Sequence, residues 1–254
     1  SKRSVFETHP HMSTTPETIS PCIRPTVNLA SRTNWFAKRS IIGAIALAAS
    51  SIASSQVSTY VFSQSTPAFS SIVGSNIPGI PNGWDDEVST AEVGIGFNFV
   101  FDGNTYTSCW VASNGFITFG ASPSPATNNY TPISSTAGYA GAISAFGRDL
   151  IGSTGAANRV KTEVQGTAPN RVFIVEWRNT RRYNVGAVAG DVLLFQIRLS
   201  ETTNAIDLHY GACTITNATA LTCEVGLRGA TNADLNNRTT ATNWSSTTAG
   251  GSNA

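Results

Sequence analysis

Apolar and polar residues alternate along most of the chain from Gln56 onward, and glycine, proline or asparagine interrupts the alternation about every 8 to 12 residues. Within residues 94–101, every second residue is isoleucine or phenylalanine, so one face of an extended chain is apolar there. β-Branched and aromatic residues fill the same segments. The pattern predicts ten strands, at residues 60–63, 94–101, 106–111, 116–119, 142–146, 160–164, 171–177, 192–199, 205–210 and 223–228.

Turn signals join these segments, and helical spacing is absent between them. Asp102-Gly103 and the run Ser113-Asn114-Gly115 consist of residues that accept turn conformations at low cost. No stretch of this region combines apolar residues at helical spacing with capping residues. Ten strands without intervening helices predict an all-β fold, namely a β-sandwich of two antiparallel sheets with jelly-roll-like connections. A closed barrel shares the pattern and is the alternative.

Residues 38–55 interrupt this pattern with a different one. Two cations, Lys38 and Arg39, precede a run of small and apolar residues that ends on serine. This is the layout of a secretory signal peptide, and it predicts a short helix, export to the cell surface or medium, and cleavage near Ser55. The run is too short and too rich in serine for a stable membrane span, which needs roughly 20 apolar residues. A buried core helix is the alternative.

The first 37 residues show neither strand nor helix periodicity, and they are rich in proline and hydroxyl residues. Such a segment cannot bury enough apolar surface to offset the entropy of ordering it. We expect residues 1–37 to be a disordered leader or an upstream reading frame, outside the fold. Residues 56–254 are then the folded domain, and their length suffices for one all-β core.

The formal net charge of +1 hides an uneven distribution. Residues 1–55 carry six of the 16 basic and two of the 15 acidic residues, which leaves 10 basic and 13 acidic residues and a net charge of −3 for residues 56–254. No basic stripe of the kind that binds nucleic acid occurs there. Nucleic acid is therefore not an expected partner.

Several separated motifs resemble those of a known family. In chain order they are FNF at 97–99, SNGFITFG at 113–120, APNRVF at 168–173, EW at 176–177, HYG at 209–211 and VGLRG at 225–229. This series resembles the N-terminal β-sandwich domain of secreted or surface Bacteroidota proteins. Residues 113–116 are also similar to nidogen-type extracellular domains, over a shorter stretch.

The Bacteroidota resemblance implies a large secreted or cell-surface protein, often with fibronectin-like modules and a C-terminal tail read by the type IX secretion system. Neither feature is visible in this chain, so we expect residues 56–254 to be a fragment whose partners are downstream modules of the same polypeptide. The implied function is a noncatalytic module for adhesion, display or spacing.

Three cysteines follow the predicted signal. Cys213 and Cys223 flank a loop of about ten residues between two predicted strands, and in an oxidising compartment we expect them to form a disulfide. Two separate buried thiols are the alternative. Cys109 lies within a predicted strand and is expected as a buried thiol, while pairing with either of the other two stays open. No Cys-x-x-Cys spacing exists, so zinc is not expected.

The sequence offers no catalytic set. His209 is the one histidine of the predicted domain, it lies in an alternating run, and no Gly-x-Ser-x-Gly elbow accompanies it. Glycoside hydrolysis needs two carboxylates, and nothing in the spacing selects a pair. The candidates are Asp149, Glu163, Glu176 and Asp207. We therefore predict that the domain is not an enzyme.

The most chemically suggestive loop is the acidic run that follows Trp84. Asp85, Asp86 and Glu87 are hard oxygen donors, and a distant carboxylate such as Asp149 could join them to bind Ca²⁺. Their spacing does not match an EF-hand loop, and a solvated acidic turn is the alternative. We expect no cofactor, with Ca²⁺ as the one exception.

Aromatic residues in loops supply a second hypothesis. Trp84, Tyr130 and Tyr183 lie in glycine-, proline- or asparagine-rich segments, where exposed rings would stack on sugars. They are the candidate ligand-binding residues for an alternative function, a carbohydrate-binding module or an accessory domain of a polysaccharide-degrading enzyme. Surface glycans would be its partners.

Overall fold

The computed structural model describes residues 2–7, 56–123, 130–153, 159–183, 191–216, 223–239 and 248–249. All of them belong to the same structural unit. The predicted signal peptide and most of the predicted leader lie outside the described residues. Within the described ranges, no helix has the length and apolar character needed to cross a membrane.

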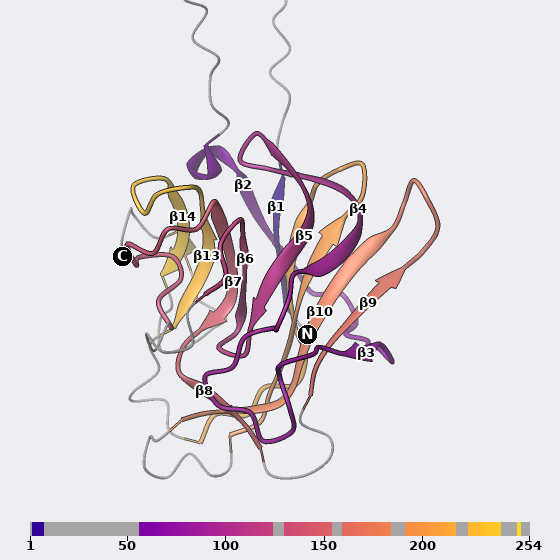
Figure 1. Ribbon diagram of the computed structural model, residues 1–254, viewed down its shortest axis with the longest axis vertical. Helices are drawn as coiled ribbons and strands as arrows, with labels where there is room; N and C mark the ends of the chain where they lie inside the picture. Colours follow the sequence, from indigo (N-terminus) through magenta and orange to yellow (C-terminus); the bar gives the residue numbers. More distant parts are fainter. Residues whose placement is uncertain are drawn as a thin grey trace, which may run out of the picture. The chain divides into compact units, whose positions relative to one another are not determined.

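The described residues form two antiparallel β-sheets, as predicted (Figure 1). The first sheet has the order β2-β1-β12-β11-β10-β9-β3, with β8 pairing to β10, and the second has the order β15-β14-β13-β7-β6-β5-β4. The strands of the first sheet are β1 (Lys2–Glu7), β2 (Val61–Ser65), β3 (Ser75–Asn76), β8 (Leu150–Gly152), β9 (Val160–Gln165), β10 (Val172–Arg182), β11 (Leu193–Ser200) and β12 (Ile206–Tyr210). Those of the second are β4 (Val93–Phe101), β5 (Asn104–Ala112), β6 (Phe116–Phe119), β7 (Gly141–Gly147), β13 (Glu224–Arg228), β14 (Leu235–Thr239) and β15 (Thr248–Ala249). One short 3-10 helix, η1 (Val57–Thr59), precedes β2.

All ten strands predicted from the alternation are present, as β2, β4 to β7 and β9 to β13. In β4, Ile95, Phe97, Phe99 and Phe101 are buried, whereas the residues between them are exposed. Successive side chains of a strand point to opposite faces, so these four side chains face the core and the residues between them, Gly96, Asn98 and Val100, face solvent.

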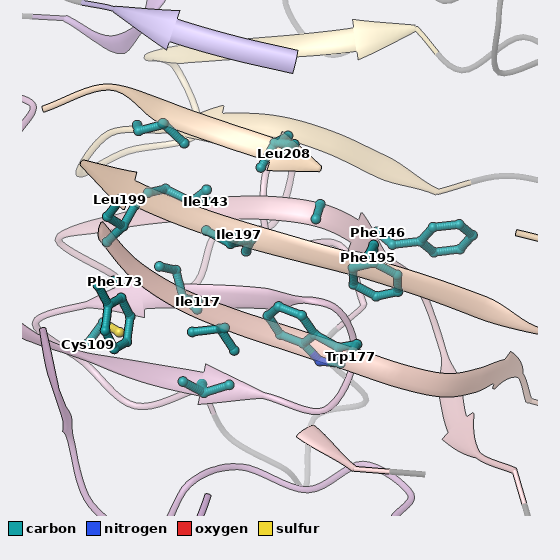
Figure 2. Packing of buried hydrophobic residues seen from close by; sticks show 14 of the residues in the cluster. Cys109, Ile117, Ile143, Phe146, Phe173, Trp177, Phe195, Ile197, Leu199 and Leu208 are labelled. Atoms are coloured by element: carbon teal, nitrogen blue, oxygen red, sulfur yellow. The ribbon is translucent and has the colours of Figure 1, made fainter. Parts of the chain in front are cut away.

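The core lies between the two sheets and is filled by aromatic and branched side chains from both (Figure 2). Trp177 of β10 stacks on Phe195 of β11 with 5.2 Å between ring centroids, and Phe146 of β7 stacks on Phe195 at 5.6 Å. The indole N–H of Trp177 donates to the carbonyl oxygen of Ala112 in β5 at 3.1 Å. The last two contacts join the sheets, because β10 and β11 belong to the first and β5 and β7 to the second.

The exclusion of residues 1–37 from the fold does not hold for Lys2–Glu7, which form β1. This strand lies between β2 and β12 and pairs antiparallel with both. Val5 and Phe6 are buried, and Phe6 packs edge-on against Phe62 with 5.4 Å between ring centroids. The hydrogen bonds to two neighbouring strands and the burial of an aromatic ring offset the entropy cost of ordering β1. The prediction was based on the average composition of the proline-rich segment, which hides this short strand.

The cysteines of the described residues carry thiols. Cys109 of β5 is fully buried in the core, as expected, and burial raises the pKa of its thiol. The predicted Cys213–Cys223 disulfide is not formed, and the Cys213 thiol instead donates to the carbonyl oxygen of Leu194 at 3.5 Å. The prediction assumed that the flanking strands make a hairpin, whereas β12 and β13 belong to different sheets.

Candidate functional site

Three carboxylates from two loops converge beside β8, which Figure 1 shows near the lower end of the view. Asp85 and Asp86 lie between β3 and β4, and Asp149 lies between β7 and β8. Oxygen atoms of the three side chains lie within 4.8 Å of one another. We call these three residues the acidic cluster. Sequence reasoning named all three as possible ligands of one cation, and the fold brings them together.

The loop that carries Asp85 is anchored to β8. Its backbone forms a β-bridge between Asp85 and Ile151, and the backbone N–H of Gly152 donates to the carbonyl oxygen of Trp84 at 3.0 Å. The Trp84 side chain is only 1% exposed and belongs to the core. Its prediction as a ligand-binding residue was therefore wrong, because a glycine- and asparagine-rich neighbourhood does not stop a large apolar ring from turning inward.

Asn114 orients the acidic cluster, although sequence reasoning treated it only as a turn residue. Its side-chain N–H donates to Oδ1 of Asp86 at 2.8 Å, and its side-chain oxygen accepts the backbone N–H of Leu150 at 2.9 Å. One amide thus links Asp86 to the start of β8. The turn can reach this position because Gly115, with φ of +86°, has no side chain: a Cβ there would lie 2.3 Å from the carbonyl oxygen of Phe146.

Partial burial and like charges disfavour ionisation of the acidic cluster. Burial, followed by the charges of Asp86 and Asp85, raises the pKa of Asp149 to about 6, and the guanidinium of Arg148 opposes this shift. Burial and then Asp86 also raise the pKa of Asp85, against the opposing charge of Arg181. One oxygen of Asp85 and one of Asp149 are buried and have no hydrogen-bond partner. Binding of a proton or a cation would reduce the repulsion between the carboxylates and give the buried oxygens a partner.

Two of the three predicted ligand-binding aromatics flank the acidic cluster. Burial, followed by the charge of Asp149, raises the pKa of Tyr130, so the phenol of this residue lies within the electrostatic field of the carboxylates. The backbone N–H of Tyr183 donates to the carbonyl oxygen of Asp149 at 3.0 Å, and Tyr183 is 39% exposed. A polar group and exposed ring surface therefore occur at the same end of the domain.

The donor set suits a hard divalent cation. Ca²⁺ and Mg²⁺ prefer carboxylate oxygens, and Asp85, Asp86 and Asp149 could hold one such ion. Glu87, the fourth predicted ligand, does not belong to the group, and it lines a shallow pocket of about 580 Å³ with residues 76–81 and Arg159.

Three of the remaining candidates for catalysis have structural roles. His209 is only 5% exposed, and burial is the main cause that lowers its pKa to about 4. Glu176 is fully buried and accepts a hydrogen bond from the side chain of Gln196 at 2.7 Å. Asp207 accepts two hydrogen bonds from Arg3. These groups stabilise the first sheet, whose strands β1, β10, β11 and β12 carry them and their partners.

These features define a class of protein: an all-β domain of two antiparallel sheets with a filled core, in which three loop carboxylates converge beside β8. The chain belongs to the NIDO-related family, whose family model matches residues 59–253. This is a domain type of extracellular, non-enzymatic proteins, and at this level the nidogen-type likeness of residues 113–116 is confirmed. No curated protein and no solved structure matches the chain. A Bacteroidota origin and type IX sorting stay predictions.

Proposed function

We propose that the protein is a noncatalytic extracellular or cell-surface module for adhesion, display or spacing within a larger secreted polypeptide. The observation that carries this proposal is the NIDO-related match, which spans both sheets from η1 onward. Because the core between the sheets is filled with side chains, loops, strand edges and the outer faces of the sheets are the surfaces that remain for partners.

Export is the first step of this function to test. The full chain with a C-terminal reporter would be expressed in a secreting bacterium, and the N-terminus of the released product read by mass spectrometry. We expect a product that begins near Gln56 and an active reporter outside the cell. Leu47→Arg, which places a charge in the apolar run, is the matched control and should retain the reporter inside. Retention of the unchanged chain would contradict the proposal.

A carbohydrate-binding module is the alternative, and the position of Tyr130 and Tyr183 beside the acidic cluster favours it. Exposed tyrosine rings stack on sugars, and nearby carboxylates accept hydrogen bonds from hydroxyl groups. The test is a glycan array with the full chain and with Tyr183→Ala, a surface change that leaves the core intact. Binding that the variant loses would support the alternative, whereas silence across the array would leave the structural module.

Calcium binding at the acidic cluster is a second property that we propose for this module. Its support is the convergence of Asp85, Asp86 and Asp149 and the two buried carboxylate oxygens that have no hydrogen-bond partner. Isothermal titration of EDTA-treated full chain with CaCl₂ tests it. We expect one site that is lost in Asp149→Asn and kept in Glu87→Gln, since Glu87 lies outside the cluster. Equal titrations of the two variants would refute it.

A further inference from the structure

The strand β1 is an inner strand of the first sheet, although its two neighbours are distant in sequence. Five residue pairs join it to β12 and five join it to β2. Residues 8–56 separate β1 from η1, and the NIDO-related match begins only at residue 59. The two neighbouring strands, β2 and β12, which we call the walls, therefore lie within the family match, whereas β1 between them does not. We call the position of Lys2–Glu7 between β2 and β12 the strand slot.

One face of the strand slot selects a cation. Arg3 donates two hydrogen bonds to Asp207, from Nε at 2.5 Å and from Nη2 at 2.6 Å. Asp207 is only 4% exposed, so this carboxylate sits at a fixed and nearly buried point along β12. The planar guanidinium of arginine matches both carboxylate oxygens at once, which a lysine ammonium does not.

The opposite face of the strand slot selects an aromatic ring. Phe6 is fully buried, belongs to the core and packs edge-on against Phe62 of β2. Residues three apart on a strand point to opposite faces, so Arg3 and Phe6 address the two faces from one strand. The slot therefore accommodates a strand with an arginine followed three residues later by an aromatic residue, paired antiparallel with both walls.

Removal of β1 would leave this slot without an occupant. The facing backbone N–H and C=O groups of β2 and β12 would lose their ladder, and the core would open beside Phe62. Cleavage near Ser55, which is part of the proposed function, would remove β1 together with the rest of the leader. A second copy processed in the same way lacks the segment as well, which favours a strand from a different polypeptide.

We propose that the strand slot is an acceptor site for an extended segment of another polypeptide, with an arginine three residues before an aromatic residue, and that Lys2–Glu7 occupies this site in the uncut chain. Backbone pairing with both walls supplies affinity in such strand addition, and the alternate side chains supply specificity. The proposal rests on the leader cleavage of the proposed function, and it assigns that module a partner chemistry.

The experiment uses the full chain with a protease site inserted within residues 10–53. The chain is cut in solution, the N-terminal fragment is removed by gel filtration, and a fluorescent peptide of residues 1–9 is added. We expect saturable binding by fluorescence anisotropy, and binding weaker by at least about tenfold for the Arg3→Glu and Phe6→Ala peptides. Because these changes lie in the peptide, the fold of the acceptor is the same in every titration. A peptide with the nine residues in scrambled order is the matched control.

Three results would overturn the proposal. The cut chain could release its fragment and fail to bind the peptide, it could bind all peptides equally, or it could close its slot by dimerisation that the peptide does not reverse. A fragment that excess labelled peptide never displaces counts against exchange as well. The titration is independent of export, so an exported chain without peptide binding refutes only the slot, and a retained chain with peptide binding refutes only the export step.

Discussion

The acidic cluster makes a quantitative prediction through Asp149→Asn. This change keeps the size of the side chain and removes its charge, and the backbone carbonyl that accepts the N–H of Tyr183 is unaffected. Burial and the charges of Asp86 and Asp85 raise the pKa of Asp149 from 3.8 to about 6. Between these values the folded protein holds a proton that the unfolded chain has lost, so this carboxyl makes the wild type less stable as the pH rises from about 4 to about 6.

The size of the effect follows from the pKa shift. A shift of one pKa unit corresponds to about 1.4 kcal/mol, and two units set an upper limit of about 3 kcal/mol. Partial exposure of the cluster screens the interaction and reduces the expected value to about 1–2 kcal/mol. Asp149→Asn should therefore match the wild type near pH 4 and exceed its free energy of unfolding by that amount above pH 6.5 in EDTA.

Urea unfolding at several pH values between 4 and 8 measures this difference, and the comparison of two proteins cancels the titrating groups that do not interact with Asp149. Glu92→Gln, at an exposed carboxylate that accepts a hydrogen bond from Ser108, is the control and should change stability by less than about 0.5 kcal/mol. A variant whose advantage is independent of pH, or one that is less stable above pH 6.5, would refute the electrostatic description. Millimolar CaCl₂ should reverse the sign of the difference, because only the wild type retains the full donor set.

Three further predictions concern the sheets. Trp177→Ala deletes a fully buried ring and should lower the free energy of unfolding in urea by about 3–5 kcal/mol. Val73→Ala, at a residue 84% exposed, is the control and should change the free energy of unfolding by less than about 0.5 kcal/mol. Equal losses in the two variants would contradict the assignment of Trp177 to the core. Asp191→Ala leaves the guanidinium of Arg182 without its carboxylate in a pair whose side chains are both 0% exposed, and thermal unfolding should show a loss of about 3–5 kcal/mol; a neutral result would refute it. His209→Gln should remove a loss of stability, roughly 1–3 kcal/mol, that the wild type undergoes as the pH falls from 6.5 towards about 4, because the folded state keeps His209 neutral while the unfolded chain protonates it; an unchanged acid limb of the stability profile would count against this.

The strands that the sequence revealed are those whose two faces differ in environment. A strand such as β4 carries nine residues of clean alternation, which is long enough for a period of two to be seen. β3, β8 and β15 have two or three residues each, too few for any period, and β14 is almost wholly polar in Leu235–Thr239. These elements are specified by their neighbours in the sheet, so a pattern along the chain could not predict them.

The site shows the same division between local and distant information. The three consecutive acidic residues Asp85, Asp86 and Glu87 are visible in the sequence as a possible cation site. Only the fold shows that the first two converge with Asp149 and that Glu87 does not. Asn114 looked like a turn residue because its hydrogen bonds run to loops remote in sequence. Two predictions failed for the same reason, because both were inferred from adjacent residues in the sequence. Packing in the core determines the burial of Trp84, and the placement of β12 and β13 in different sheets separates the two cysteines.

The place of β1 also determines the order in which the chain is assembled. The ion pair of Arg3 with Asp207 joins residues 204 apart, so this edge of β1 cannot pair until β12 has been translated, whereas β2, at Val61–Ser65, is available much earlier. Closing so long a loop costs only a little more entropy than closing a medium one, but it is slow, and nearer strands pair first. β1 can therefore pair with β2 early, whereas its other edge stays open until β12 has been made.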